Sequence, residues 1–314
     1  MDKETMVTIR SGLLAVIISF FLYKMSATST LFIIPLLFVA PKLPSDRWAL
    51  IPVGVVAVAL TGYHIIGYAP VLSEPYISGT ILVGLFLPIT LLVGTAIFII
   101  IKRSTIEKLL YATLFAAFYG FSLMIWFKTN SEVASVTAEV YYQAVKSAIP
   151  VVFSESLPLG LDESSIFASL VKLIRLGFLP LFVGQFALSV FITKQMQNRN
   201  NVEFQDKLSN FSLPEITIWP FLISLTLVLF SAFINMVPIE TLGWNIGGVL
   251  LLAYMVQGIA IVTYLIRKKS EMISATRIYI FALILMVIPP INVLPLLGLP
   301  LLGISETWVK LRKV

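Results

Sequence analysis

The sequence lacks cysteine altogether and has a single histidine, His64. Without thiols the chain can form no disulfide, thiolate nucleophile, iron–sulfur cluster or cysteine-ligated zinc site. A nucleophile–histidine site would have to use His64 itself. The phosphate-binding pattern G-x-x-x-x-G-K-[S/T] and the nucleophile pattern G-x-S-x-G are also missing. We therefore expect no enzyme activity, no metal and no cofactor.

Charged side chains are also scarce. Only 12% of the residues are charged, whereas soluble domains have about 25%. Hydrophobic residues make up 58% of the chain, and the mean hydropathy is +0.97. Because lipid can absorb that much apolar surface, we predict an all-α, polytopic transmembrane helical bundle with about 8–10 membrane helices. The net charge of +6 then reflects loop Lys and Arg that orient the helices, and we expect no nucleic-acid partner.

Residues 79–103 set the predicted orientation of the chain. No charged side chain occurs over 79–101, and Lys102 and Arg103 follow together. Basic pairs of this kind stay on the cytoplasmic side during insertion. The first apolar run, 13–23, follows basic residues as in a signal peptide, but more apolar runs come at once, so we interpret it as an uncleaved helix. We expect a multi-pass protein of the bacterial cytoplasmic (inner) membrane with both termini in the cytoplasm.

The order of apolar and polar stretches predicts three segments. These are N-terminal transmembrane helices over 1–127, an external amphipathic segment over 128–175, and a C-terminal transmembrane bundle with a short cytoplasmic tail over 176–314. In the middle segment we expect a surface helix that ends before Pro150 and a second short helix behind Asp162. The last apolar block, 278–304, contains four prolines, and we interpret it as a bent hairpin that returns the chain to the cytoplasm. The other membrane helices are expected over 6–24, 29–41, 48–68, 79–101, 109–127, 176–193, 216–237 and 244–266, and the short helix over 29–41 either forms a tight hairpin with the first or enters the membrane only partly.

Two connections between these helices are also expected. Residues 194–211 should form a hydrophilic cytoplasmic loop, and residues 238–244 a very short external turn. Asn235, Trp244 and Asn245 bracket that turn and could line an external mouth.

Polar and interfacial side chains within or beside these helices are candidates for a substrate pocket. Each could instead form a structural interhelical hydrogen bond, worth about 0.6 kcal/mol. The functional alternative is a pocket for a mostly apolar or neutral solute. The candidates are His64, Gln185, Asn235, Trp244, Asn245, Gln257 and Asn292.

Two further groups are candidates for partner docking. Ser11, Ala15 and Ser19 recur at a four-residue spacing that lets helices approach closely, either within this chain or against another membrane protein. Near the C-terminus we expect Glu306, Trp308 and Arg312 to form a cytoplasmic interfacial cluster. Trp prefers the headgroup level, and the spacing of Glu306 and Lys310 favours an ion pair. This cluster is either a membrane anchor or a partner site.

The C-terminal third also carries a family resemblance. It contains the segment LPEITIWP, a glycine-bearing apolar stretch around Gly258, and a closing G-x-x-[D/E]-x-W-x-x-x-R pattern that begins at Gly303. In these features the chain resembles the YybS-like family of bacterial membrane proteins, which is distantly similar to the substrate-binding subunits of energy-coupling-factor transporters. The resemblance implies a solute-binding subunit that docks through small residues of its first helix, here Ser11, Ala15 and Ser19. This chain is longer than those subunits and has no recognisable vitamin-site motif.

Two functions therefore stay open at the level of sequence. One is a solute-binding subunit of an energy-coupling-factor-like transporter, with other membrane-protein subunits and a small-molecule solute as partners. The other is a non-transporting scaffold or assembly factor of an envelope or division complex. The lipid bilayer is a partner in both.

Overall fold

The computed structural model describes residues 3–25, 28–68, 74, 76–152, 162–198, 201–270 and 273–312. Every regular element in those ranges is a helix, which confirms the predicted all-α class. The chain divides into two compact units, Met1–Lys194 and Gln195–Val314. Within the described ranges, seven helices are long and apolar enough to cross a membrane, and three shorter apolar helices accompany them. The chain is therefore a polytopic helical membrane bundle.

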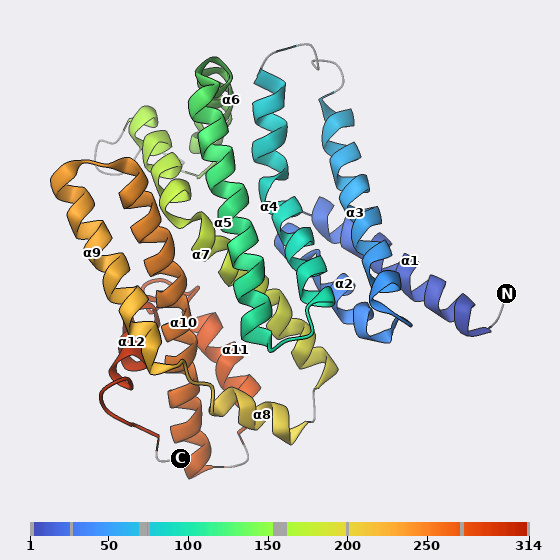
Figure 1. The fold of residues 1–314 in the computed structure, drawn as a ribbon, viewed down its shortest axis with the longest axis vertical. Helices are drawn as coiled ribbons and strands as arrows, with labels where there is room; N and C mark the ends of the chain where they lie inside the picture. Colours follow the sequence, from blue (N-terminus) through green and yellow to red (C-terminus); the bar gives the residue numbers. More distant parts are fainter. Residues whose placement is uncertain are drawn as a thin grey trace. The chain divides into compact units, whose positions relative to one another are not determined.

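The first unit is built around α4, which packs against α3, α5 and α6. Figure 1 shows α3, α4 and α5 running side by side. α1 packs against α3 and against a short segment made of η1, α2 and η2. The bounds are α1 Lys3–Lys24, η1 Ser29–Leu31, α2 Ile34–Val39, η2 Ala40–Lys42, α3 Asp46–Gly67, α4 Tyr76–Ile100, α5 Thr105–Thr129, α6 Ser131–Val152 and α7 Glu163–Gln197.

Polar residues define the ends of these apolar helices. The side chain of Ser104 accepts from the backbone of Glu107, and the Glu107 carboxylate accepts from the backbone of Ser104, which forms a complete capping box for α5. Lys102, in the loop between α4 and α5, lies 2.6 Å from a carboxylate oxygen of Asp46 at the start of α3. The ion pair places the start of α3 and the end of α4 at the same end of the unit, as the charge pattern requires.

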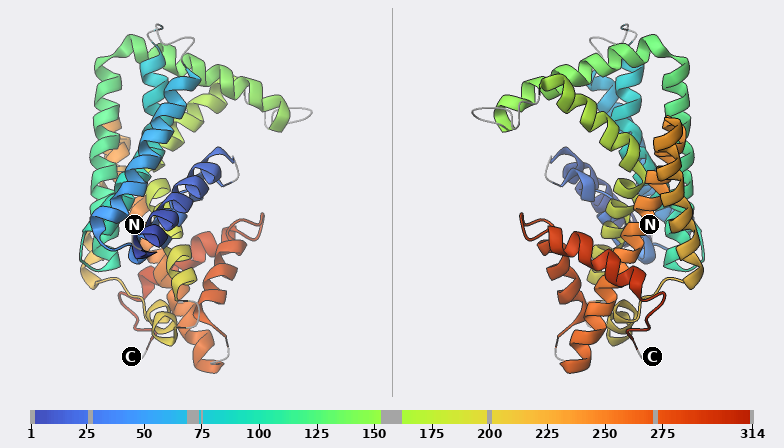
Figure 2. Two further views of the ribbon diagram at one scale, coloured as in Figure 1. Left: turned by 90° about the vertical axis from the view of Figure 1, so that its right-hand side faces the viewer. Right: turned by 90° about the vertical axis from the view of Figure 1, so that its left-hand side faces the viewer.

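α6 is the predicted amphipathic helix, and it packs across the beginning of α4 (Figure 2). The buried Thr137 side chain occupies the space that a side chain at Gly79 would need. Lys146 pairs with Glu163 at 3.0 Å, which joins α6 to the start of α7. The backbone of Ser165 donates to Asp162 as the predicted helix start requires. Two boundaries were wrong: α6 continues past Pro150, and the second short helix is continuous with the helix expected over 176–193.

The second unit begins with a helix that the sequence did not predict. α8 (Val202–Ser209) forms in the hydrophilic stretch that we expected to be a loop. η5 (Glu215–Thr217), α9 (Ile218–Ile234) and α10 (Val237–Lys269) follow. Asn235 ends α9 with φ 52°, a left-handed conformation that Asn tolerates better than most residues. α10 starts two residues later, so the expected external turn over 238–244 is wrong and those residues are helical.

α11 (Ala275–Leu285) and α12 (Val293–Ser305) form the bent end of the chain. α12 crosses α10 where two glycines meet. A Cβ at Gly258 would collide with the backbone of Leu299, and one at Gly303 would collide with the backbone of Tyr254. Only glycine permits this close backbone approach. The bend predicted for the last apolar block is confirmed, because a turn over 286–292 separates the two short helices.

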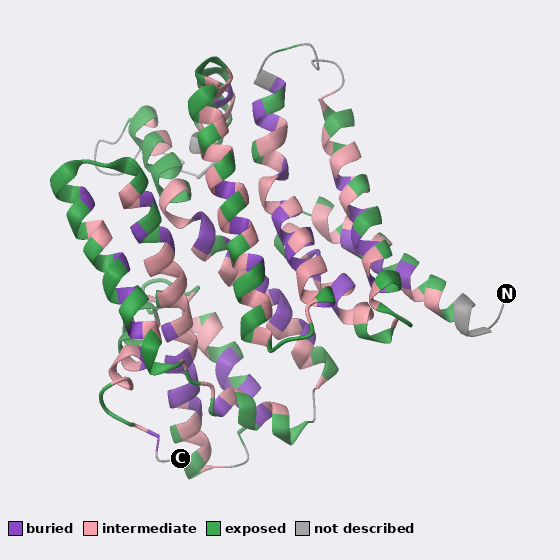
Figure 3. Ribbon diagram, in the orientation of Figure 1, coloured by how far each residue is buried: buried purple, intermediate pink, exposed green. Residues whose placement is uncertain are grey.

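The burial pattern agrees with a membrane environment. Buried and exposed residues alternate around the helices (Figure 3). Many of the exposed residues are large and apolar. Phe118 on α5 and Phe233 on α9 are 73% and 83% exposed. Such wide apolar surfaces are stable against lipid and would be costly in water.

Candidate functional site

In the first unit, His64 lies among aromatic rings from α1 and α3. Its Nε2 is 2.6 Å from the hydroxyl of Tyr23, with which it shares a hydrogen bond. The ring centroid of Tyr63 lies 5.8 Å from that of the imidazole, edge to face. The ring of Tyr23 also packs edge to face against Phe32, with 5.5 Å between the ring centroids. Gly84 of α4 lies next to the imidazole, because a Cβ at this position would be 3.4 Å from His64 Cε1.

A second polar side chain reaches the same part of the unit from α7. The amide of Gln185 donates to the backbone carbonyl of Thr30 at 2.7 Å. Thr30 belongs to η1, two residues before Phe32, so Gln185 and Tyr23 both contact the turn between α1 and α2. We call Tyr23, Phe32, Tyr63, His64 and Gln185 the His64 cluster.

The His64 cluster combines ring faces with a few polar groups. Tyr23, His64 and Gln185 are each half-buried, so they are neither sealed in a core nor fully in solvent. Lys24 adds a positive charge, with its Nζ 4.8 Å from the centre of the Tyr63 ring. An imidazole, a phenol and an amide provide both donors and acceptors. This combination is typical of sites that orient a largely apolar ligand through a small number of hydrogen bonds.

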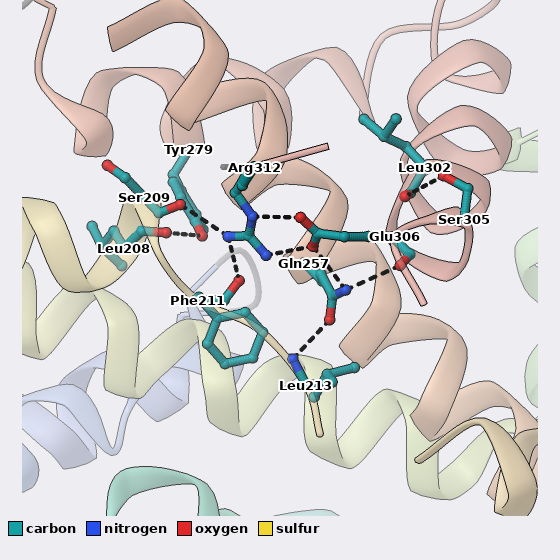
Figure 4. A network of polar contacts seen from close by, with 11 residues as sticks. Leu208, Ser209, Phe211, Leu213, Gln257, Tyr279, Leu302, Ser305, Glu306 and Arg312 are labelled. Atoms are coloured by element: carbon teal, nitrogen blue, oxygen red, sulfur yellow. Dashed lines mark hydrogen bonds and ion pairs between the residues drawn. The ribbon is translucent and has the colours of Figure 1, made fainter. Parts of the chain in front are cut away.

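In the second unit, the closing C-terminal residues form a buried polar network (Figure 4). The guanidinium of Arg312 pairs with both carboxylate oxygens of Glu306, and the Nε–Oε1 distance is 2.7 Å. Nη1 of Arg312 also donates to the carbonyls of Ser209 and Phe211, at 3.1 and 2.8 Å. The Arg312 side chain is 4% exposed and that of Glu306 is 11% exposed. The charge on each is therefore satisfied by the other and by backbone carbonyls.

Gln257 of α10 completes this network. Its amide nitrogen donates to the carbonyl of Gly303 and to Glu306, at 3.1 Å each, and its oxygen accepts from the backbone of Leu213 at 2.8 Å. We call Gln257, Glu306 and Arg312 the C-terminal network. The glycine crossing of α10 and α12 is what brings Gln257 within reach of Gly303.

The expected partners of Glu306 were only partly right. Glu306 pairs with Arg312, and the predicted pairing with Lys310 is wrong, because α12 ends at Ser305 and the helical spacing does not continue. Trp308 is 68% exposed, as a residue at the headgroup level would be. Tyr279 lies beside the network and donates to the carbonyl of Leu208.

The remaining pocket candidates do not gather into one site. Asn235 caps α9. Trp244 and Asn245 are neighbours in α10 but lie on different faces, since Trp244 is 48% exposed and Asn245 is fully buried and donates to the carbonyl of Thr241. Asn292 sits in the turn before α12. The expectation that Asn235, Trp244 and Asn245 bracket an external turn is therefore wrong.

The small-residue positions of α1 are covered by the chain itself. Ala15 and Ser19 are 2% and 0% exposed, and α1 packs on α2 and α3. The hydroxyl of Ser11 donates to the carbonyl of Val7 in its own helix. Ala15 and Ser19 therefore pack within the chain, which is one of the two interpretations given for these small residues. The exposed residues of α1 are instead large and apolar, such as Leu13 and Phe21.

Sequence reasoning missed several residues of both sites. Tyr23 and Phe32 looked like ordinary apolar positions, and only the fold brings them to His64. Ser209 and Phe211 contribute backbone carbonyls, which carry no sequence signal at all. The one available clue was Gly303, because glycine in an apolar helix often marks close packing.

Together, the fold and these sites define a multi-pass helical membrane protein with a buried polar network at its C-terminus. A family model described as "Predicted membrane protein (DUF2232)" matches residues 12–300. The chain therefore belongs to this family of predicted membrane proteins. No curated protein and no solved structure matches it.

Proposed function

We propose that this protein is a solute-binding subunit of a membrane transport system and that the His64 cluster is its solute site. The observation that carries the proposal is that Gln185 and Tyr23, the hydrogen-bond partner of His64, both contact the turn between α1 and α2 although they are far apart in the sequence. In this role the chain is not an enzyme. His64 and Gln185 bind the solute, and Tyr23 fixes the orientation of the imidazole.

The chemistry of the cluster favours a planar, mostly apolar solute without a positive charge. Tyr63 and Phe32 offer ring faces, and His64, Tyr23 and Gln185 offer hydrogen bonds in one region. Lys24 beside Tyr63 favours an acceptor group on the solute over a cation. We place the protein in the bacterial cytoplasmic membrane, with ATPase and coupling subunits as separate chains. The resemblance to energy-coupling-factor subunits supports this as an analogy of fold class.

Native mass spectrometry of the protein purified from bacterial membranes tests the proposal. We expect a bound small molecule on the wild type and its loss in the double variant His64→Leu, Gln185→Leu. Asn235→Gly is the matched control, because glycine tolerates the left-handed conformation at that helix end. A wild type without bound molecule, or a double variant that retains it, would overturn the proposal.

A scaffold or assembly factor is the second candidate, and α6 is the observation that favours it. This helix lies across the beginning of α4 and exposes a polar face with Glu139 and Gln143. A spectrum that shows partner chains without any small molecule, and partner loss on shortening α6, would favour this function over transport.

A further inference from the structure

The α11–α12 segment of the second unit has an unusual distribution of polar and apolar groups. Figure 2 shows the two short helices joined by their turn. The two ends of the segment are polar and anchored, whereas the turn between them is apolar and exposed. We propose that α11 and α12 form a re-entrant hairpin, which inserts its turn among the acyl chains of one leaflet and returns to the side from which it entered. The inference uses residues of the second unit alone and is independent of the proposed solute site.

Both ends of the hairpin are bound to the same short stretch of chain, residues 205–211. At the start of α11, the amide of Gln205 donates to the hydroxyl of Thr276 at 2.8 Å, and the backbone of Thr276 donates back at 3.0 Å. Beyond α12, Arg312 donates to the carbonyls of Ser209 and Phe211. Because one stretch holds the entry and the exit, both must lie on one side of the bilayer.

The two helices are too short to cross. α11 has 11 residues and α12 has 13. At 1.5 Å per residue they are about 16 and 20 Å long. A hydrocarbon core is about 30 Å thick. The turn can therefore reach into the near leaflet but cannot emerge on the far side.

The turn meets much of the main requirement for entering lipid, which is that backbone donors are satisfied internally. Met286, Val287 and Asn292 donate to carbonyls of the hairpin, at 3.1, 3.0 and 2.9 Å. Pro289 and Pro290 have no donor to satisfy.

The exposed side chains match a single leaflet from headgroup to acyl chain. No charged residue occurs over 278–305. Around the turn, Val287 and Leu294 are 77% and 76% exposed. At the anchored ends, Arg277, Trp308 and Lys310 are exposed, and cations and aromatic rings of this kind prefer the level of phosphate headgroups. This order favours a lipid leaflet over a protein partner as the occupant.

The absence of native cysteine makes a clean test available. Single cysteines replace Leu294 near the turn, Ile273 before α11 and Val309 beyond α12, and each full-length variant is reconstituted in phosphatidylethanolamine–phosphatidylglycerol vesicles. A nitroxide on each cysteine then reports collisions with oxygen, which concentrates in lipid, and with a water-soluble nickel chelate. We expect the oxygen-to-nickel collision ratio to rise at Leu294→Cys relative to both Ile273→Cys and Val309→Cys. A membrane-impermeant maleimide should block the two end positions from the same side.

Each other outcome overturns the inference in a distinct way. Nickel collisions at Leu294→Cys as frequent as at the ends would place the turn in water. Low collisions with both reagents would place it against protein. Maleimide labelling of Ile273→Cys and Val309→Cys from opposite sides would make the segment a true span. Circular dichroism on each labelled variant confirms that the helices remain folded.

Discussion

The two units satisfy their buried polar groups in different ways. In the first unit, Thr95, Ser189 and Thr193 donate to carbonyls one turn back in their own helices, so each bond is local. In the second unit, Asn245 and Thr263 also bond within their own helix. Further buried bonds there join distant segments, as between Gln257 and Gly303. The first unit therefore depends mainly on apolar packing. The second unit depends on a network in which each member needs the others.

This difference makes the second unit sensitive to single polar changes. A buried ion pair contributes little by comparison with an apolar pair of the same shape, but removal of one partner leaves an uncompensated charge. The local hydroxyl bonds of the first unit leave no charge behind when they are lost. The predictions below test this contrast, beginning with the largest expected effect.

Arg312→Ala should produce the largest loss of stability. It leaves the Glu306 carboxylate, 11% exposed, without its cation, and it frees two backbone carbonyls. Breaking a buried pair in this way typically costs about 3–5 kcal/mol. A detergent-denaturation titration measures this loss as the difference in unfolding free energy between the variant and the wild type. Lys310→Ala, an exposed cation two residues away, is the control, and Glu306→Gln added to Arg312→Ala should recover part of the loss. Equal effects of Arg312→Ala and Lys310→Ala would remove the contrast between the units.

Gly303→Ala should have the next largest effect. The added Cβ would collide with the backbone of Tyr254, which cannot move without shifting α10. Overpacking of this kind costs about 1–3 kcal/mol. Gly298→Ala in the same helix is the matched control, since nothing lies within 4 Å of its Cβ. Gly120→Ala in α5 provides the comparison with the first unit, because its Cβ meets the ring of Phe178, a side chain that can rotate.

The same titration reports all three glycine variants. We expect the loss of unfolding free energy to be greatest for Gly303→Ala, smaller for Gly120→Ala and near zero for Gly298→Ala. If Gly298→Ala destabilised the protein as much as Gly303→Ala, the close approach of α10 and α12 would not be a source of stability.

The sequence predicted the features that depend on long apolar runs. The membrane helices and the bend between α11 and α12 follow from composition, proline placement and helical period. The missed features depend on which segments meet. α8 is a polar helix of only eight residues, shorter than the stretch of about 11–18 residues over which helical periodicity is read. Its role as the anchor of Arg312 rests on a backbone carbonyl.

The candidate sites show the same limit. His64 and Gln185 were identifiable as polar residues in apolar helices, but nothing in the sequence connects them to Tyr23 or Thr30. Gln257, Glu306 and Arg312 were each singled out, yet the contact of Gln257 with Glu306 requires the glycine crossing. Periodicity predicts which face of a helix is apolar, and it carries no information on which helix covers that face.

Tyr23→Phe should produce the smallest of the predicted effects and the one most specific to function. It removes the hydroxyl bonded to His64 and keeps the ring that packs on Phe32. A half-buried neutral hydrogen bond contributes about 0.5–1.5 kcal/mol, so the unfolding free energy should fall by no more than that. Retention of any small molecule in the native mass spectrum should fall as well, because the imidazole loses the partner that orients it. Tyr111→Phe, at an exposed tyrosine of α5, is the control. A stability loss like that of Arg312→Ala would show that the first unit also rests on a polar network. An unchanged spectrum would show that Tyr23 packs against His64 without supporting a solute.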